Sequence, residues 1–248
     1  MSGSGEQPSG EARVEAGMLR VDGELIAYER RIGDRAGGFV VFLHGAGTGS
    51  MERTTQLATE VVAAGANTVA FDFSGHGRST GTLAELSLRR REVQAAAVIG
   101  ALCDPGAPLV LVGFSMSGQT VCDIIGSVGA DAVFLCCPAA YRPDVAELPF
   151  GNPEFTRMIR EEGAWSASTA FGAVAAFPGE VAFVIPDQDE VIPPALTRTY
   201  LDSRPDSLLL TLPGCPHRIA GWLRNKPEQR QRLVAAMSRA ADPGQPVL

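Results

Sequence analysis

The chain has 248 residues, of which 45% are hydrophobic and 20% are charged, so it can bury a sizeable core and is not intrinsically disordered. Its formal net charge of −7 argues against a nucleic acid or an anionic membrane as a partner, because both require a basic surface. The length suits one large α/β domain, and no apolar run approaches the roughly 20 residues that span a membrane.

The two ends of the chain differ in composition from the part between them. Residues 1–11 are rich in Gly, Ser and Pro, and this composition predicts a disordered tail. Residues 241–248 are similar and are predicted to form a second tail. Residues 12–240 contain no linker and no internal repeat. We therefore expect them to form a single domain.

The first ordered element is predicted to be an antiparallel hairpin. Met18–Val21 and Glu24–Tyr28 flank Asp22-Gly23, a dipeptide that tolerates the positive φ angles of a type I′ turn. Beyond the hairpin, six short apolar runs are bounded by Gly, Pro or Asp, as expected for strands that are buried on both faces in a parallel sheet. These runs are Phe39–Leu43, Thr68–Phe71, Leu109–Val112, Ala132–Cys136, Val181–Ile185 and Leu208–Leu212.

Helical patterns alternate with these strands. The predicted helices are Met51–Ala64, with Ser50 as its N-cap, Ser87–Leu102, Ser117–Val128 and Pro227–Ala240. Alternation of this kind is typical of βαβ units with right-handed crossovers. The sequence therefore predicts an α/β fold with a mostly parallel twisted sheet, helices on both faces and an antiparallel N-terminal hairpin.

One interval, Pro138–Pro178, interrupts the alternation because it contains no strand pattern. It is longer than an ordinary connection. Asn152-Pro153 suits a helix N-cap followed by Pro at the first helical position, and Ser166–Ala176 is weakly helical. We interpret the interval as a small lid insertion over the edge of the sheet. The alternative is an ordinary crossover helix with a long loop.

The strongest chemical signal lies where the strand at Leu109–Val112 runs directly into a helix, at Gly113-Phe114-Ser115-Met116-Ser117-Gly118. A turn this tight forces its central residue into a strained backbone conformation and requires small neighbours. The pattern predicts that Ser115 stands at a helix N-terminus, where the helix dipole favours developing negative charge. A serine in that position is suited to act as a nucleophile.

The elbow and four further segments, in this chain order, resemble the α/β-hydrolase superfamily, and together they cover nearly the whole domain. They are Phe42–Gly47, Phe71–Ser79, the elbow at 113–118, Val184–Pro193 and Leu212–His217. They are similar, in turn, to the family's oxyanion loop, D-x-x-G-H-G-x-S loop, G-x-S-x-G elbow, acid loop and histidine loop. The chain departs from the pattern at Ser117, where the elbow usually has Gly, and at Pro186, where a Gly is common.

The resemblance implies a catalytic triad in the order nucleophile, acid, base. The matching residues are Ser115, Asp189 and His217. Backbone N–H groups of Ala46 and Met116 would form the oxyanion hole, since one follows the His-Gly pair and the other follows the serine.

Several nearby residues offer alternatives. Asp187 competes with Asp189 as the acid, although the family's spacing favours Asp189. His44 and His76 are interpreted as hydrogen-bonding residues that fix loops. Catalysis by Cys215 would leave the Ser115 elbow without a role.

The predicted function is a serine hydrolase that cleaves a carboxylic ester or thioester of a small, largely apolar substrate. Trp165, Ile192 and Trp222 are the predicted substrate-binding residues, although core packing explains them equally well. Acyl transfer, lactonisation or C–C bond hydrolysis by the same triad is the first alternative. A non-catalytic binding protein of hydrolase fold is the second.

The cysteines and histidines indicate neither disulfides nor a metal site. There are five cysteines, an odd number, and no spacing typical of metal ligands. No N-terminal run resembles a secretory signal, so we expect a reduced cytoplasmic protein. No metal or organic cofactor is expected. The expected partner is a small-molecule substrate, not a nucleic acid or a membrane, and a homodimer is left open.

Overall fold

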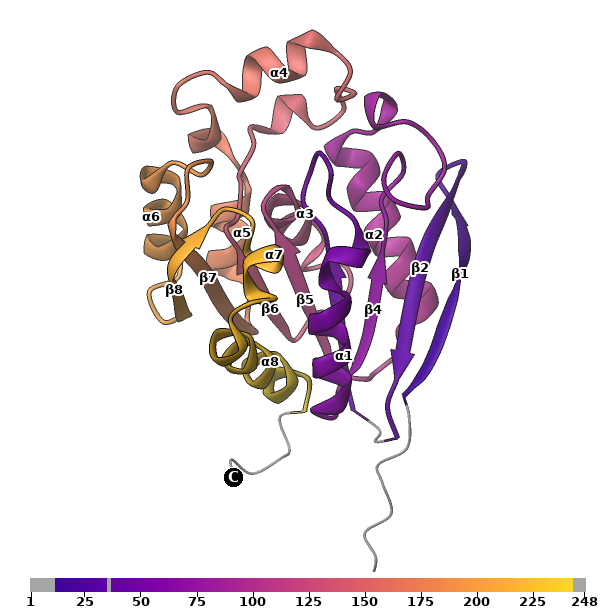
Figure 1. Ribbon diagram of the computed structural model, residues 1–248. Helices are drawn as coiled ribbons and strands as arrows, with labels where there is room; N and C mark the ends of the chain where they lie inside the picture. The colour runs from indigo at the N-terminus through magenta and orange to yellow at the C-terminus, as the bar shows by residue number, and fades with distance from the viewer. Residues whose placement is uncertain (1–11, 35–36, 243–248) are drawn as a thin grey trace, which may run out of the picture.

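The computed structural model describes residues 12–34 and 37–242 (Figure 1). Its centre is an eight-stranded sheet in the order β1-β2-β4-β3-β5-β6-β7-β8. The strands are β1 Arg13–Val21, β2 Glu24–Ile32, β3 Phe39–Leu43, β4 Asn67–Phe71, β5 Leu109–Phe114, β6 Ala132–Cys136, β7 Glu180–Gln188 and β8 Leu208–Pro216. The predicted tail at 1–11 lies outside the described residues, as does the predicted tail at 241–248 except for Ala241, which ends α8, and Asp242.

The predicted N-terminal hairpin is confirmed, with strands longer than expected. β1 and β2 pair antiparallel around Asp22 and Gly23, whose φ angles are 54° and 79°, as a type I′ turn requires. β2 also pairs antiparallel with β4, and this pairing attaches the hairpin to the parallel part of the sheet.

From β4 to β8 every neighbouring pair of strands is parallel. All residues of β3, β4, β5 and β6 are buried, which explains their continuous apolar sequences. Because the strands run in one direction, their carboxyl ends meet at one edge of the sheet. The predicted fold class is therefore confirmed, and this edge is where loops from distant parts of the chain come together.

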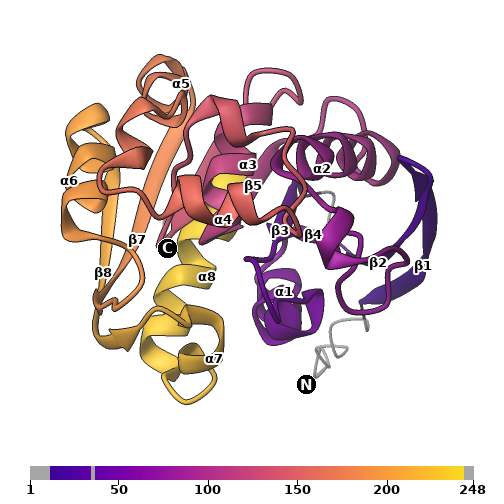
Figure 2. The same ribbon diagram turned by 90° about the horizontal axis from the view of Figure 1, so that it is seen from above.

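Helices cover both faces of the sheet (Figure 2). They are α1 Thr55–Ala63, α2 Leu88–Leu102, α3 Met116–Ile124, α4 Pro153–Ile159, α5 Ala170–Ala176, α6 Pro194–Ser203, α7 Ile219–Leu223 and α8 Pro227–Ala241. Short 3-10 helices occupy Met51–Thr54, Leu83–Glu85, Pro143–Val145 and Ala164–Ala167. α1 and α8 pack together on one face, and α2, α3, α5 and α6 form a row on the other.

Two helix starts and one helix end refine the sequence predictions. Ser50 precedes a 3-10 turn and makes no side-chain cap; the carboxylate of Asp72 accepts from the backbone N–H of Met51 instead, at 2.7 Å. Ser87, by contrast, caps α2 by accepting from the N–H of Arg90. α8 includes Ala241, one residue beyond its predicted end. The sequence patterns did not predict α6 and α7, which are short and bury few side chains.

The interval at 138–178 contains features both of a lid insertion and of an ordinary crossover helix. α5 packs beside α3 and α6 as a crossover helix between β6 and β7. α4 lies above the carboxyl edge of the sheet (Figure 1), and Asn152 caps it as predicted by accepting from the N–H of Glu154. The insertion is fastened to α3 because the side-chain oxygen of Gln119 accepts from Ser168 Oγ and from the N–H of Tyr141.

No helix in residues 12–34 and 37–242 is long and apolar enough to cross a membrane.

Candidate active site

Ser115 occupies the turn between β5 and α3. Its φ and ψ angles are 52° and −114°, a backbone conformation that residues with a side chain rarely adopt. Strand and helix approach so closely that a Cβ atom on Gly113 would lie 2.6 Å from the carbonyl oxygen of Ser117. The glycine is therefore required for this turn, and the turn places Ser115 at the first turn of α3.

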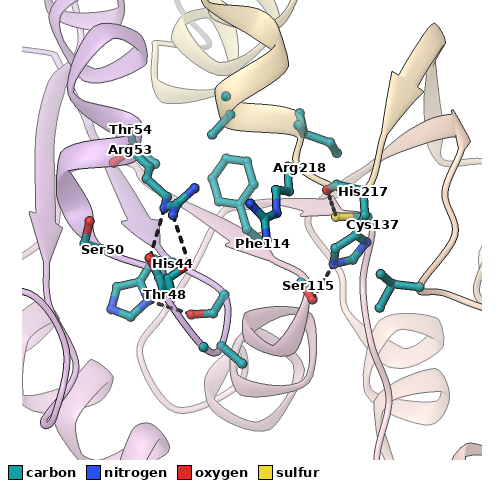
Figure 3. A pocket seen from close by; sticks show the side chains of 18 of the residues that line it. His44, Thr48, Ser50, Arg53, Thr54, Phe114, Ser115, Cys137, His217 and Arg218 are labelled. Atoms are coloured by element: carbon teal, nitrogen blue, oxygen red, sulfur yellow. Dashed lines mark hydrogen bonds between the residues drawn. The ribbon is translucent and has the colours of Figure 1, made fainter. Parts of the chain in front are cut away.

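Ser115, His217 and Asp189 form one hydrogen-bonded chain. Ser115 Oγ lies 3.0 Å from His217 Nε2 (Figure 3). The other ring nitrogen, Nδ1, faces the Asp189 carboxylate, with its oxygens at 2.9 and 3.0 Å. The structure thus brings together three residues that lie on loops after β5, β7 and β8 and that the sequence placed in this order.

The environment of Asp189 favours its charged form. Burial by itself raises the pKa of this carboxyl, but hydrogen bonds from His217 and from the N–H groups of Ile192 and Val191 outweigh burial and lower it. A carboxylate held by two backbone donors also has a fixed orientation. Asp189 can therefore fix the imidazole ring and stabilise a positive charge on it.

Asp187 does not reach His217. The pairing of β7 with β8 is irregular between Pro186 and Gln188, and such irregularities redirect side chains. The exposed side chain of Asp187 accepts a hydrogen bond from the N–H of Gly214 at 2.7 Å. The geometry thus favours Asp189 over Asp187 as the partner of the histidine.

The loop after β3 lies directly against Ser115. A Cβ atom on Gly45 would be 3.3 Å from the Cβ of Ser115. The preceding residue, His44, is buried and holds two loops together: its Nδ1 donates to the carbonyl of Gly45 at 2.7 Å and its Nε2 accepts from the N–H of Phe73 at 3.1 Å. Burial and the nearby Arg91 hold the pKa of His44 well below its usual value. The prediction that His44 fixes loops is confirmed.

A buried arginine, which the sequence analysis missed, braces this loop. Arg91 of α2 is fully buried, and its Nη2 donates to the His44 carbonyl at 2.8 Å and to Ser117 Oγ at 2.6 Å. Its guanidinium also lies 3.7 Å from the centre of the Phe73 ring. Burial lowers the pKa of Arg91 to about 9. The available signal was its position three residues after Leu88 on the buried stripe of α2.

Ser117, the departure from the elbow pattern, belongs to the same network. It is fully buried and its Oγ donates to the His44 carbonyl at 2.6 Å while accepting from Arg91. The hydroxyl therefore ties the start of α3 to the end of β3. A glycine at this position would provide no such link.

Asp72 organises the loop after β4. Its two carboxylate oxygens accept from the N–H groups of Met51 and Arg78. Gly77 has a φ of 48°, and a Cβ atom there would overlap the Asp72 carboxylate. His76 is buried beside His44, with ring centres 4.7 Å apart, and its Nδ1 donates to the carbonyl of Ser74. This loop supports the site from behind and takes no direct part in the Ser115 chain.

A cavity of about 560 Å³ opens beside Ser115 (Figure 3). Its walls are the loop after β3, the 3-10 turn that carries Arg53 and the start of α7. Phe114 and Ile219 contribute apolar surface, and Arg218 lies on the wall beside His217. The cavity therefore lies between α1 and α7, to one side of the insertion that carries α4.

The three predicted substrate-binding residues are not among those that line this cavity. Trp165 packs edge-on against Phe171 as part of the core. Ile192 is buried, and Trp222 lines a separate surface hollow with Lys226. The sequence could not distinguish these packing roles from a binding role because both use large apolar side chains.

A thiol lies next to the triad. Cys137 has a φ of 42° and is buried, and its Sγ donates to the carbonyl of His217 at 3.5 Å. In the described part of the chain, the sulfur is grouped with Asp189 and His217 within 4.8 Å, a set of atoms that could hold a metal ion. Burial raises the pKa of the Cys137 thiol well above its usual value, and both His217 nitrogens already have partners. The cluster therefore fits a neutral thiol beside a hydrogen-bonded triad better than a set of ligands.

Comparison with known proteins assigns the family. Residues 40–244, most of the chain, match the profile of the alpha/beta hydrolase family. The chain belongs to this family. The match extends from β3 through α8 and so includes every loop of this hydrolase that contributes to the Ser115 site.

Solved structures share the fold of this hydrolase at low sequence identity. Est1E from Butyrivibrio proteoclasticus, with bound ferulic acid, is 19% identical with a TM-score of 0.69, covering 90% of this chain and 99% of its own. The Pyrococcus furiosus esterase Pf2001 is 16% identical with a TM-score of 0.68, covering 92% and 93%. A thioesterase domain from the curacin biosynthetic pathway is 16% identical with a TM-score of 0.67, covering 91% and 99%. No curated protein matches the chain.

Proposed function

We propose that this alpha/beta hydrolase is a serine hydrolase that cleaves a carboxylic ester or thioester through an acyl-Ser115 intermediate. The observation that carries the proposal is the chain from Ser115 Oγ to His217 Nε2 and from His217 Nδ1 to Asp189, with distances of 3.0 and 2.9 Å. This arrangement has the order and the contacts that a nucleophile, a base and an orienting acid require. The esterase and thioesterase among the structural neighbours support the same class of reaction.

Each step follows from the contacts of these side chains. Ser115 Oγ attacks the carbonyl carbon while its proton passes to His217 Nε2. The negative charge of Asp189 stabilises the resulting imidazolium and keeps the ring in the required tautomer. His217 then returns the proton to the departing alcohol or thiol. A water molecule, activated by the same imidazole, releases the acid from Ser115.

The negative charge that develops on the carbonyl oxygen requires donors close to Ser115. Met116 begins α3, and the first N–H groups of a helix have no partner within it. Ala46 follows Gly45, which lies against Ser115. We assign the oxyanion hole to the N–H groups of these two residues, Met116 and Ala46. The loss of one such donor typically lowers kcat by about 10²- to 10³-fold.

Hydrolysis is favoured over transfer to another acceptor because solvent reaches the site. The cavity wall includes exposed side chains such as Arg218 and Val191, so water can enter beside the acyl group. All five cysteines are free, which supports a reducing compartment such as the cytoplasm. The substrate is proposed to be a small molecule that fits the cavity beside Ser115.

A fluorophosphonate probe tests the proposal directly. The wild-type protein should be labelled on Ser115 and should release p-nitrophenol from short p-nitrophenyl esters, whereas the Ser115→Ala protein should do neither. Product analysis with a competing alcohol or amine distinguishes hydrolysis from acyl transfer. A wild-type protein that stays unlabelled while a known serine esterase reacts would make this a non-catalytic member of the family.

A further inference from the structure

We infer that the cavity binds a substrate that carries an anionic oxygen group, a carboxylate or a phosphate, and that Arg53 and Arg218 hold this group. The inference rests on the proposed function, because it describes the part of the substrate that extends away from the scissile carbonyl at Ser115. It adds an anionic group to the small, largely apolar substrate that the sequence led us to expect.

The two arginines belong to different walls of the same cavity. Arg53 lies on the 3-10 turn before α1, and Arg218 directly precedes α7. Both line the cavity that contains Ser115. Figure 3 shows the two guanidinium groups directed toward the space beside the Phe114 ring. A ligand bound to Ser115 could therefore meet both cations.

Neither cation is neutralised by the described part of the protein. No carboxylate of residues 12–34 or 37–242 lies within 4.0 Å of either guanidinium. The side chain of Arg218 is exposed and makes no hydrogen bond to these residues. Arg53 uses Nε and Nη2 to donate to the carbonyl and hydroxyl of Thr48, both at 3.0 Å, which leaves its Nη1 free for a ligand.

One acidic residue also lines the cavity, but it faces another group. A carboxylate oxygen of Glu190 lies 3.4 Å from the backbone N–H of His217, so it belongs to the wall that carries the triad. The positive charges of Arg53 and Arg218 in the same cavity repel each other, and a bound anion reduces this repulsion. In a protein with a net charge of −7, such a local cationic site also attracts anionic substrates selectively.

The rest of the lining limits the shape of the substrate. Besides Ser115 and the arginines, the cavity lining includes Phe114, Ala46 and Ile219. The side chains of these residues offer apolar contacts and no charge. The cavity therefore suits an ester or thioester in which a short apolar segment separates the scissile carbonyl from the anion.

The inference is tested with pairs of esters whose two members differ by a single negative charge. In the first pair, the p-nitrophenyl monoester of glutaric acid is compared with its methyl ester, so the charge lies on the acyl side. In the second pair, 4-butyryloxybenzoate is compared with its methyl ester, so the charge lies on the alcohol side. The wild-type protein should prefer the anionic member of at least one pair by about tenfold in kcat/KM, as expected for charge-assisted hydrogen bonds. Added salt should reduce that preference.

Substitutions at Arg218 assign the preference to this residue. Arg218→Gln should reduce the ratio of anionic to neutral kcat/KM several-fold, and Arg218→Glu should reduce it further or invert it. Because the side chain is exposed and makes no hydrogen bond or ion pair with other described residues, neither change should prevent folding. Arg198→Gln is the matched control, since Arg198 is exposed on α6 and lies outside the cavity lining, and its ratio should equal that of the wild type.

A binding measurement separates this inference from the proposed function. The Ser115→Ala protein is titrated with the same esters by calorimetry and should bind the preferred anionic ester about tenfold more tightly than its neutral partner. The inference is overturned if neither pair shows an anionic preference in turnover or binding, or if Arg218→Gln lowers both members of a pair equally. Tight anionic binding by a wild-type protein without turnover or probe labelling would instead retain the anion site and overturn the proposed hydrolase.

Discussion

The strained backbone at Ser115 leads to a prediction that separates chemistry from stability. Ser115→Gly and Ser115→Ala both remove Oγ and its hydrogen bond to His217, so both should abolish ester turnover. They differ in backbone freedom alone. At a φ of 52° and a ψ of −114°, glycine is unstrained, whereas alanine keeps the steric conflict of its Cβ atom. The glycine variant should therefore be the more stable of the two.

The size of the difference follows from two opposing terms. A residue with a side chain in such a conformation costs about 1–3 kcal/mol. Glycine adds conformational freedom to the unfolded chain and so costs about 0.5–1 kcal/mol. The Ser115→Gly protein should therefore exceed the Ser115→Ala protein by about 0.5–2 kcal/mol in free energy of unfolding. In a chain of this length that difference raises Tm by about 1–8 °C.

Differential scanning calorimetry of the two variants at one pH gives the difference directly. The hydrogen bond lost from His217 cancels in the comparison because neither variant has Oγ. An alanine variant that melts at a higher temperature than the glycine variant would refute the reasoning, since only the cost of glycine in the unfolded chain would then remain. In that case Ser115 would be held in place without backbone strain.

Three further predictions follow from the contacts around the site. Asp189→Asn should lower kcat by about 10⁴-fold, because the asparagine amide would favour the wrong tautomer of His217. Asp187→Asn should leave kcat within about a factor of ten of the wild type. The reverse ranking in esterase assays would make Asp187 the acid. Ser117→Ala removes one of the acceptors of the buried Arg91 and the hydrogen bond from Ser117 to the His44 carbonyl, and it should lower the free energy of unfolding by about 1–3 kcal/mol. Ser127→Ala, at a partly buried local hydrogen bond, should cost less in the same melts. Burial raises the pKa of Asp123 to about 7, although a hydrogen bond from the Gln119 amide lowers it in part. The folded protein therefore favours the neutral carboxyl, and the contribution of Asp123 to the free energy of unfolding is greatest at low pH and is lost as the pH rises to about 7. Asp123→Asn should therefore raise Tm relative to the wild type by more at pH 8 than at pH 5, and an equal change at both pH values would contradict the raised pKa.

The strands and most helices could be predicted because their sequence patterns are local. Phe39–Leu43 and Ala132–Cys136 have the predicted bounds, and Asp22-Gly23 forms the predicted turn. α6 escaped prediction because only Leu196 and Tyr200 are buried on it. Its pattern of apolar residues is therefore too sparse to indicate a helix.

The candidate site could be predicted in its members but not in its surroundings. Ser115 and His217 are marked by the loops that carry them, and their order along the chain determines which strand ends they follow. Arg91 was missed because a charged residue in a helix is ordinarily solvated, and its burial depends on the loops that close over it. Trp165 packs against the core and does not line the cavity beside Ser115, and its apolar side chain alone could not distinguish packing from binding.

The amino-acid sequence alone determined the strands, the glycines that permit the sharp turn and the order of serine, acid and base. These properties depend on backbone preferences and on spacing within short segments. Only the tertiary structure decided which carboxylate faces His217, which arginine braces the loop and which walls enclose the cavity. Those outcomes depend on contacts between residues far apart in the chain, such as Arg91 and His44, and such contacts exist only after the sheet and its helices have packed together.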